Sequence, residues 1–123
     1  SSNVLKFKPE VIVDVAKAEM VKMQVNEAYV NTHEGKYIGK LHLKALIFAK
    51  PSDAIIKYTD TEALNIKSDA SLQQAIETAA NFIGETIPIV DKWTKLMINC
   101  FNPFPNNEDN ESWVMMDEIF HLD

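Results

Sequence analysis

Two segments of the chain alternate between apolar and polar residues, and this period of two constrains the fold more than any other feature. In residues 20–31 the apolar side chains fall mainly on odd-numbered positions, and residues 37–49 repeat the pattern. Successive side chains of a β-strand point to opposite faces, so this alternation predicts strands with one buried face. Residues 32–35 between them are polar and end in glycine, as a hairpin loop often does. We therefore predict an antiparallel hairpin over about residues 20–49.

Two helices are predicted after the hairpin. The first covers about residues 69–84, with Ser68 or Asp69 as its N-cap, and the second covers about residues 87–101. Helical spacing places the apolar residues of the first helix on one stripe. That stripe consists of Leu72, Ala75, Ile76, Ala79 and Ile83.

The fold class predicted from these elements is α+β: a hairpin or small sheet packed with two helices and a short C-terminal element. Residues 10–18 are predicted as a short helix or a strand, and residues 54–59 and 63–67 as further short strands. The alternative is an all-α fold, in which residues 9–31 form one long helix with Pro9 in its first turn. We find no internal repeat in the sequence.

A chain of 123 residues fits a single domain, residues 1–123, and its 46% hydrophobic content suits a globular protein. The single cysteine, Cys100, cannot form an intramolecular disulfide, and its neighbours predict a buried thiol. No apolar run reaches the roughly 18–20 residues that a membrane-spanning helix needs. We therefore expect no membrane association and a cytoplasmic location, in the host cytoplasm if the protein is viral.

The sequence lacks the motifs of familiar enzyme sites. It has only three glycines, and they are not clustered, so no phosphate-binding loop is predicted. No serine or cysteine lies in a recognisable nucleophile motif. Glu118 and His121 have the spacing found in di-iron bundles, but the second such motif is missing. We expect a non-enzymatic protein without a cofactor or a metal ion.

Charge is distributed unevenly along the chain. The twelve basic residues are all lysines, and the abundance of lysine, asparagine and isoleucine is typical of a low-GC bacterium or phage. The predicted hairpin is rich in lysine, and a basic sheet face can neutralise phosphates without reading sequence. A nonspecific single-stranded nucleic-acid-binding protein is therefore one alternative function. Its contact residues would be Lys22, Lys36, Lys40, His42 and Lys44.

The C-terminal half is acidic, and we favour it as the contact surface of a small accessory or assembly protein. Residues 102–112 form a loop rich in proline, asparagine and acids, followed by the acidic-hydrophobic segment 113–123. Such a segment could bind another protein, or a second copy of this chain in a homo-oligomer. The predicted partner-binding residues are Trp113, Met116, Phe120, Glu108, Asp109, Glu111, Asp117 and Glu118.

Two further expectations concern this acidic segment. It resembles the acidic C-terminal tails of bacterial and phage single-stranded-DNA-binding proteins, which end in an aromatic residue and recruit partners. Here Phe120 is followed by three more residues, and no glycine-rich linker precedes the acids. Acidic composition also suggests another alternative, an inhibitor that mimics nucleic acid and blocks a DNA-binding enzyme.

Overall fold

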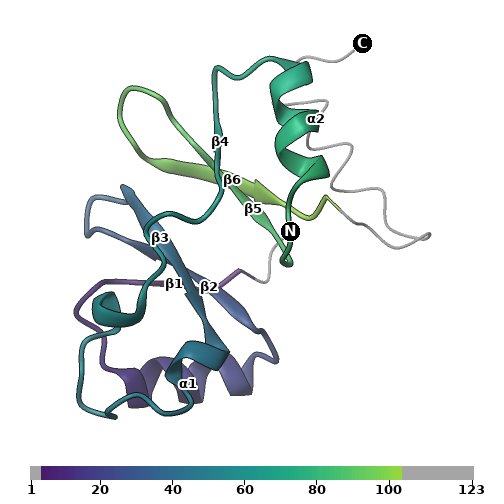
Figure 1. Cartoon of the computed structure of the whole chain (residues 1–123). Helices are drawn as coiled ribbons and strands as arrows, with labels where there is room; N and C mark the ends of the chain where they lie inside the picture. Colours follow the sequence, from purple (N-terminus) through teal and green to yellow (C-terminus); the bar gives the residue numbers. More distant parts are fainter. Residues whose placement is uncertain (1–3, 104–123) are drawn as a thin grey trace. The chain divides into compact units, whose positions relative to one another are not determined.

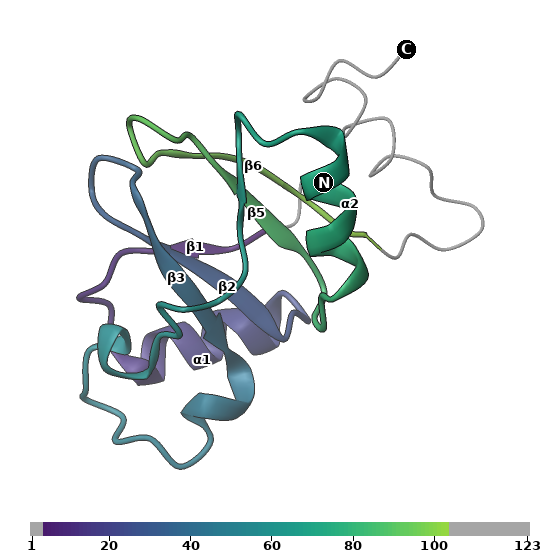
Figure 2. The same ribbon diagram turned by 45° about the horizontal axis from the view of Figure 1, so that its top comes forward.

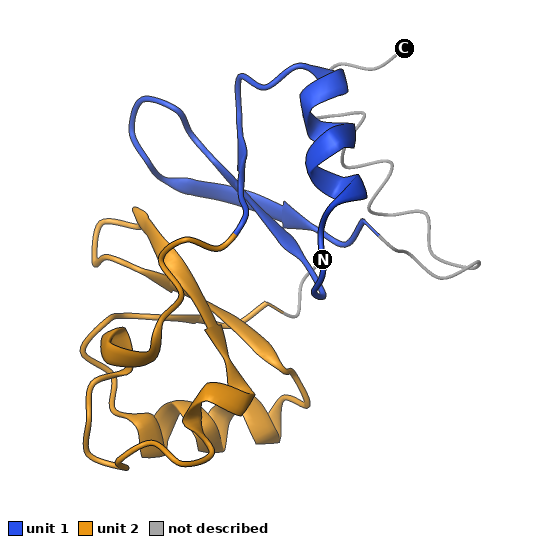
Figure 3. Ribbon diagram, viewed as in Figure 1, with its two compact units in different colours: residues 1, 64–123 blue, residues 2–63 orange. Residues whose placement is uncertain are grey.

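The computed structural model describes residues 4–103, and the chain forms two compact units. The N-terminal unit comprises residues 2–63, and the C-terminal unit begins at Leu64 (Figure 3). Each unit contains a three-stranded sheet and a helix, which confirms the α+β class and excludes the all-α alternative. The single domain expected from the chain length stays a prediction.

The N-terminal unit is a strand–helix–strand–strand motif (Figure 1). Its sheet has the order β1-β2-β3, with β1 parallel to β2 and β2 antiparallel to β3. Two short 3₁₀ helices follow β3. The elements are β1 (Lys6–Phe7), α1 (Val13–Lys22), β2 (Glu27–Asn31), β3 (Tyr37–His42), η1 (Leu43–Leu46) and η2 (Ile55–Tyr58).

The C-terminal unit repeats this motif. Its sheet has the order β4-β5-β6, with β4 parallel to β5 and β5 antiparallel to β6, and α2 packs on the sheet (Figure 2). The elements are β4 (Ile66–Lys67), α2 (Leu72–Ala80), β5 (Ile87–Val90) and β6 (Met97–Phe101).

The repeat extends to the register of the strands. Lys6 pairs with Tyr29 in the first sheet, and Ile66 pairs with Ile89 in the second. Both members of the second pair therefore lie 60 positions after their counterparts, at 66 against 6 and at 89 against 29. The repeat is therefore one of structure: the two halves share strand pairing, although no repeated residue pattern is recognisable in the sequence.

The predicted hairpin exists, but it is shorter than residues 20–49. Helix α1 takes residues 13–22, because Val13, Ala16 and Met20 recur at helical spacing and are fully buried. Residues 10–18 are therefore largely helical. Residues 54–59, predicted as a strand, contain η2, whereas a strand within residues 63–67 is confirmed by β4.

Strand β2 is buried on both faces, whereas the alternation predicted one buried face and one polar face. Ala28 and Val30 lie in the hydrophobic core of the N-terminal unit, together with Leu41 of β3. Tyr29 lies on the other face, in register with Lys40. The odd-numbered apolar residues 21 and 23 belong to α1 and its C-cap, so the alternation over residues 20–31 did not reflect the strand.

The helix predicted at residues 69–84 is confirmed in shorter form, with a different N-cap. Ser71 begins α2: its Oγ accepts a hydrogen bond from the Gln74 N–H at 3.1 Å, and its own N–H donates to Gln74 Oε1 at 2.9 Å. This capping box satisfies two backbone groups that the first helical turn leaves unpaired. Of the predicted stripe, only Ala75 and Ala79 are buried.

The helix predicted at residues 87–101 is wrong, because this segment forms the β5–β6 hairpin. All four residues of β5 are buried, and three of them are β-branched, which favours a strand over a helix. Strand β6 ends with Cys100 and Phe101 buried, which confirms the buried thiol. Among the described residues, no helix is long and apolar enough to cross a membrane. The cytoplasmic location stays a prediction.

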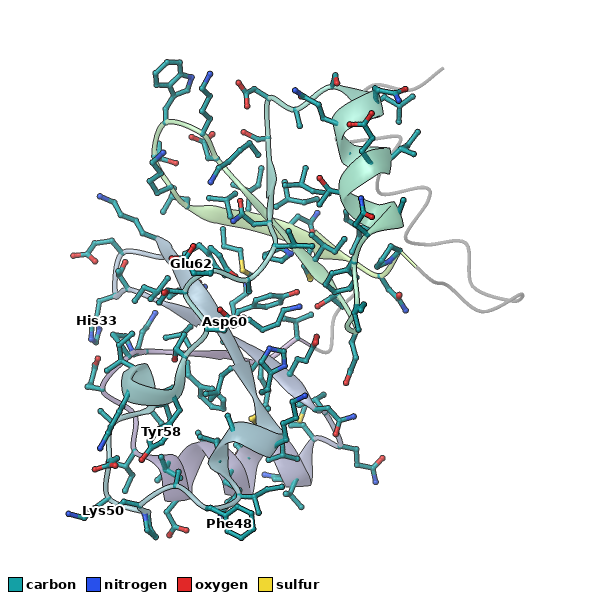
Figure 4. All side chains as sticks on the ribbon, in the orientation of Figure 1. His33, Phe48, Lys50, Tyr58, Asp60 and Glu62 are labelled. Atoms are coloured by element: carbon teal, nitrogen blue, oxygen red, sulfur yellow. The ribbon has the colours of Figure 1, made fainter. Side chains whose placement is uncertain are left out.

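Gly39 in β3 allows a neighbouring segment to cross close to the strand. The Lys40 N–H donates to the Asp60 carbonyl at 3.0 Å, and the Asp60 N–H donates back to the Lys40 carbonyl at 2.8 Å. A Cβ at Gly39 would lie 2.4 Å from the Asp60 carbonyl oxygen. Asp60 follows η2, and its position beside β3 is visible in Figure 4.

Replacing Gly39 with alanine should destabilise the N-terminal unit. The added methyl group cannot fit without moving the backbone at Asp60, so we expect a loss of about 1–3 kcal/mol in the free energy of unfolding. Urea denaturation followed by circular dichroism measures it. Lys44→Ala, at an exposed position, is the control and should change stability by less than about 0.5 kcal/mol. Equal stability of Gly39→Ala and wild type would contradict the close approach of the Asp60 backbone to Gly39.

Asp53 connects η2 to the start of α1. Its carboxylate accepts a hydrogen bond from the Tyr58 hydroxyl at 2.6 Å and from the Lys57 ammonium at 3.3 Å, and its carbonyl accepts from the Val13 N–H at 2.9 Å. The hydrogen bond from Tyr58 makes the largest contribution to lowering the pKa of the Asp53 carboxyl, and the hydrogen bond from Lys57 lowers it further. A lowered pKa in the folded state stabilises the fold above the unfolded pKa of about 3.9, and this stabilisation is lost as the pH falls through the folded value.

Tyr58→Phe should therefore destabilise the protein more at pH 7 than at pH 2. At pH 7 the variant lacks a hydrogen bond to an ionised carboxylate, whereas at pH 2 the wild-type carboxyl is already protonated. Urea midpoints of both proteins at the two pH values test this. In an Asp53→Asn background the pH-dependent part of the difference should vanish; if it persists, Asp53 is not the group responsible.

Candidate ligand-binding site

The C-terminal unit contains a cavity of about 810 Å³, within the range of small-molecule sites. Its walls come from three places in the motif: the segment around β4, helix α2, and the turn between β5 and β6. All of the lining residues within the described part of the chain belong to the C-terminal unit. These walls are therefore formed within one copy of the strand–helix–strand–strand motif.

Helix α2 supplies the polar wall of the cavity. Gln74, Glu77 and Thr78 of the helix and its C-cap Asn81 line the cavity, at the three- and four-residue spacing that places side chains on one face of a helix. Ala75 and Ala79 on another face are buried against the sheet, where small side chains let the helix approach closely. Burial of the alanine face against the sheet thus fixes the direction of the polar face.

Three lysines and two carboxylates set the electrostatics of the cavity. Lys67 lies at the end of β4, and Lys92 and Lys95 lie in the β5–β6 turn. Asp69, before α2, and Glu77 on the helix provide the negative charge. Among residues 4–103 the lining therefore carries a formal charge of +1 and presents several ammonium groups, which favours anionic ligands.

The β5–β6 turn is organised by Asp91. Its carboxylate accepts hydrogen bonds from the N–H groups of Thr94 at 2.7 Å and Trp93 at 2.9 Å, and the Thr94 hydrogen bond is the main cause of its lowered pKa. The Lys95 N–H donates to the Asp91 carbonyl at 3.0 Å. Lys95 adopts a φ of 67°, a left-handed conformation usual for a residue that closes such a hairpin loop. The turn thereby holds two lysines at the cavity.

Lys92 has two neighbours in the turn and across the cavity. Its ammonium group lies 3.1 Å from Asp69 Oδ2 and 5.2 Å from the centre of the Trp93 ring. The side chains of Lys92 and Asp69 are about half exposed, at 49% and 50%. The ion pair is therefore accessible to solvent and to a dissolved ligand.

The cavity has the chemistry of a binding site. Its described lining contains amide, hydroxyl, ammonium and carboxylate groups, but neither histidine nor cysteine. Within residues 4–103, no group of three histidine, cysteine or acidic side chains is arranged to hold a metal ion. These groups can bind and orient an anion through charge-assisted hydrogen bonds.

The residues predicted for nucleic-acid binding lie on several elements of the N-terminal unit. Lys22 ends α1, Lys36 lies in the β2–β3 turn, Lys40 and His42 are in β3, and Lys44 is in η1. Lys22, Lys36 and Lys44 are exposed, and His42 is half-buried. They come from four different parts of the unit, and the predicted exposure of Lys40 is wrong.

Lys40 is 2% exposed and belongs to a buried polar cluster. Its ammonium group donates to Glu27 Oε2 at 3.2 Å and lies 5.7 Å from the centre of the Tyr29 ring. His42 Nδ1 lies 3.9 Å from the other carboxylate oxygen of Glu27. Glu27 lies diagonally across the hairpin, and its side chain is only 9% exposed. The pair therefore stabilises the fold, and a Lys40 ammonium held in this way is unavailable to a phosphate.

Lys40→Met should strongly destabilise the protein, because it leaves the Glu27 carboxylate buried without its ammonium partner. We expect a loss of about 3–5 kcal/mol in the free energy of unfolding, measured by urea denaturation. The double variant Lys40→Met/Glu27→Leu should recover most of this loss, and Lys36→Ala is the exposed-lysine control. A single variant as stable as Lys36→Ala would contradict the buried pair.

The predicted partner-binding residues of the acidic C-terminal segment lie outside the described residues, and their role stays a prediction. These residues are Glu108, Asp109, Glu111, Trp113, Met116, Asp117, Glu118 and Phe120.

Comparison with known proteins identifies the fold as that of CBS (cystathionine β-synthase) domains. A CBS domain protein from Streptococcus pneumoniae superposes with a TM-score of 0.72 at 14% identity, covering 98% of this chain and 80% of that one. CbpB in complex with c-di-AMP gives a TM-score of 0.73 at 13% identity, covering 96% of this chain and 79% of CbpB. No family model and no curated protein matches the sequence.

The same fold occurs within longer proteins. The cytosolic domain of the Mg²⁺ channel MgtE, in complex with ATP, superposes with a TM-score of 0.70 at 15% identity over 83% of this chain. This chain spans only 43% of that domain and 60% of a CBS pair domain from a Shewanella oneidensis Mg²⁺ transporter. At these identities the likeness establishes the fold, and the chemistry of the site has to come from this chain's own residues.

Sequence reasoning missed the cavity. Three lysines, Lys67, Lys92 and Lys95, lie in the acidic C-terminal half of the sequence. The negative net charge of that half gave no indication that they would lie together. One local pattern could have pointed to the turn: Asp91 is followed by an exposed Trp93 and two lysines, and aspartate often opens a turn by accepting backbone hydrogen bonds.

Proposed function

We propose that this protein is a non-enzymatic ligand-binding accessory module, and that the cavity of its C-terminal unit binds a small anionic ligand of the nucleotide class. The observation that carries the proposal is the gathering of Lys67, Lys92 and Lys95 around a cavity of about 810 Å³. Ammonium groups bind phosphate oxygens through charge-assisted hydrogen bonds. The amide and hydroxyl groups of α2 can bind the less charged part of the ligand.

The comparisons support the ligand class. ATP is bound by the cytosolic domain of MgtE, and c-di-AMP is bound by CbpB. Both proteins share the fold of this chain, and both ligands combine an aromatic base with phosphate groups. A further part of the proposal is that ligand occupancy is passed to another protein or to a second copy of this chain. MgtE supports this part, since its ligand-bound domain belongs to a channel.

Calorimetric titration of the protein with ATP and with c-di-AMP tests the proposal. We expect saturable binding of at least one of them, weakened about tenfold by Lys67→Ala and again by Lys95→Ala, because each removes a hydrogen bond between charged groups. Lys36→Ala, which removes an exposed lysine of the N-terminal unit, is the matched control and should leave the affinity unchanged.

Two results would overturn the proposal. One is the absence of binding of either nucleotide at millimolar concentration and low salt. The other is a loss of affinity in Lys36→Ala as large as in the cavity variants, which would indicate a general effect of net charge. Circular dichroism of each variant verifies that the fold is retained.

A further inference from the structure

We propose that Asp69 acts as an internal competitor of the ligand, and that Lys92 must exchange the Asp69 carboxylate for an anionic group of the ligand when the cavity is filled. This inference rests on the proposed function and deepens it, because it assigns a ligand contact to Lys92 and a selective role to Asp69. Both residues line the cavity, and their charged atoms are 3.1 Å apart.

The geometry of the pair favours exchange. Asp69 lies between β4 and α2, whereas Lys92 lies in the β5–β6 turn, so the pair joins two walls of the cavity. Both side chains are half exposed, and an exposed ion pair is weak, because water screens the attraction and fixing two long side chains costs entropy. A dianionic or more highly charged phosphate group offers Lys92 a stronger partner than one carboxylate.

The competing anion also acts on selectivity. A ligand with a single negative charge gains little binding free energy by replacing Asp69, because Lys92 loses its contact with one carboxylate and forms a similar contact with one ligand anion. A polyphosphate gains more, because it brings at least two charges to the same group of lysines. The pair therefore discriminates against small monoanions and in favour of di- and triphosphates.

Lys92 is also positioned to report the exchange. Its ammonium group lies 5.2 Å from the centre of the Trp93 ring, and the Trp93 side chain is 82% exposed. A cation over an indole face is held by the ring quadrupole. When Lys92 moves to a ligand, this contact changes, so the emission of Trp93 should change with occupancy.

The first test compares Asp69→Asn with Glu77→Gln. Both variants remove one carboxylate from the cavity, but the Glu77 carboxylate accepts its hydrogen bond from Gln73 Nε2, at 3.0 Å, whereas Asp69 pairs with a lysine. We expect Asp69→Asn to bind ATP and inorganic tripolyphosphate about two- to fivefold more tightly than wild type, and Glu77→Gln to show a smaller gain. The gain from Asp69→Asn should disappear in a Lys92→Ala background.

The second test uses fluorescence. The chain has two tryptophans and three tyrosines, so Trp113→Phe leaves Trp93 as the only tryptophan, and excitation at the long-wavelength edge of tryptophan absorption avoids the tyrosines. Saturating tripolyphosphate should change the emission of this variant and leave the emission of Trp113→Phe/Lys92→Ala unchanged.

The outcomes separate this inference from the proposed function. Binding that depends on Lys67 and Lys95, with equal affinities for Asp69→Asn and Glu77→Gln, overturns the exchange and leaves the ligand-binding function intact. Failure of the wild type and of every variant, including Asp69→Asn, to bind either probe overturns both.

Discussion

The structure depends on the central strand of each sheet. Strand β2 pairs with β1 on one side and β3 on the other, and β5 pairs likewise with β4 and β6. In each unit one of these pairings is parallel, and a parallel pair needs a crossover connection, which α1 and α2 provide. Once the central strand is buried and paired, the helix has one face available for the sheet and another that is left for solvent or a ligand.

The two copies of the motif use this frame differently. In the N-terminal unit, the polar groups on the sheet stabilise the fold. Lys40 is paired with Glu27, and β3 forms backbone hydrogen bonds with Asp60 next to Gly39. In the C-terminal unit, the polar face of α2 and the β5–β6 turn surround a cavity with three lysines. Duplication of a fold therefore does not imply duplication of a site, since the chemistry depends on side chains that the backbone pairing does not specify.

The sequence predicted those elements whose residue pattern is local. The β2–β3 hairpin was found because a polar turn separates two alternating segments, and α2 because of its apolar stripe. Strand β5 was missed because all four of its residues are buried, so it shows no alternation, and the β5–β6 loop has Lys95 rather than glycine in the left-handed conformation. The burial of Lys40 depends on Glu27 across the hairpin, which alternation alone does not show.

The candidate site could not be predicted from the sequence, because its residues are far apart along the chain. Lys67 and Lys95 are 28 positions apart (95 − 67), and only the pairing of β4 with β5 brings their segments to one cavity. Periodicity describes neighbours within one element, whereas a ligand site collects side chains from several. The fold class could be predicted, but the binding surface could not.

The central claim is that the C-terminal unit binds a phosphate-containing ligand in its lysine-lined cavity. Nuclear magnetic resonance of the ¹⁵N-labelled full chain, titrated in turn with ATP and with c-di-AMP, tests it most directly, because each backbone amide reports its own surroundings. The account predicts saturable shifts concentrated at Lys67, along the polar face of α2 and in the β5–β6 turn. Saturable shifts confined to residues 4–63, or no saturable shifts at all, would contradict it.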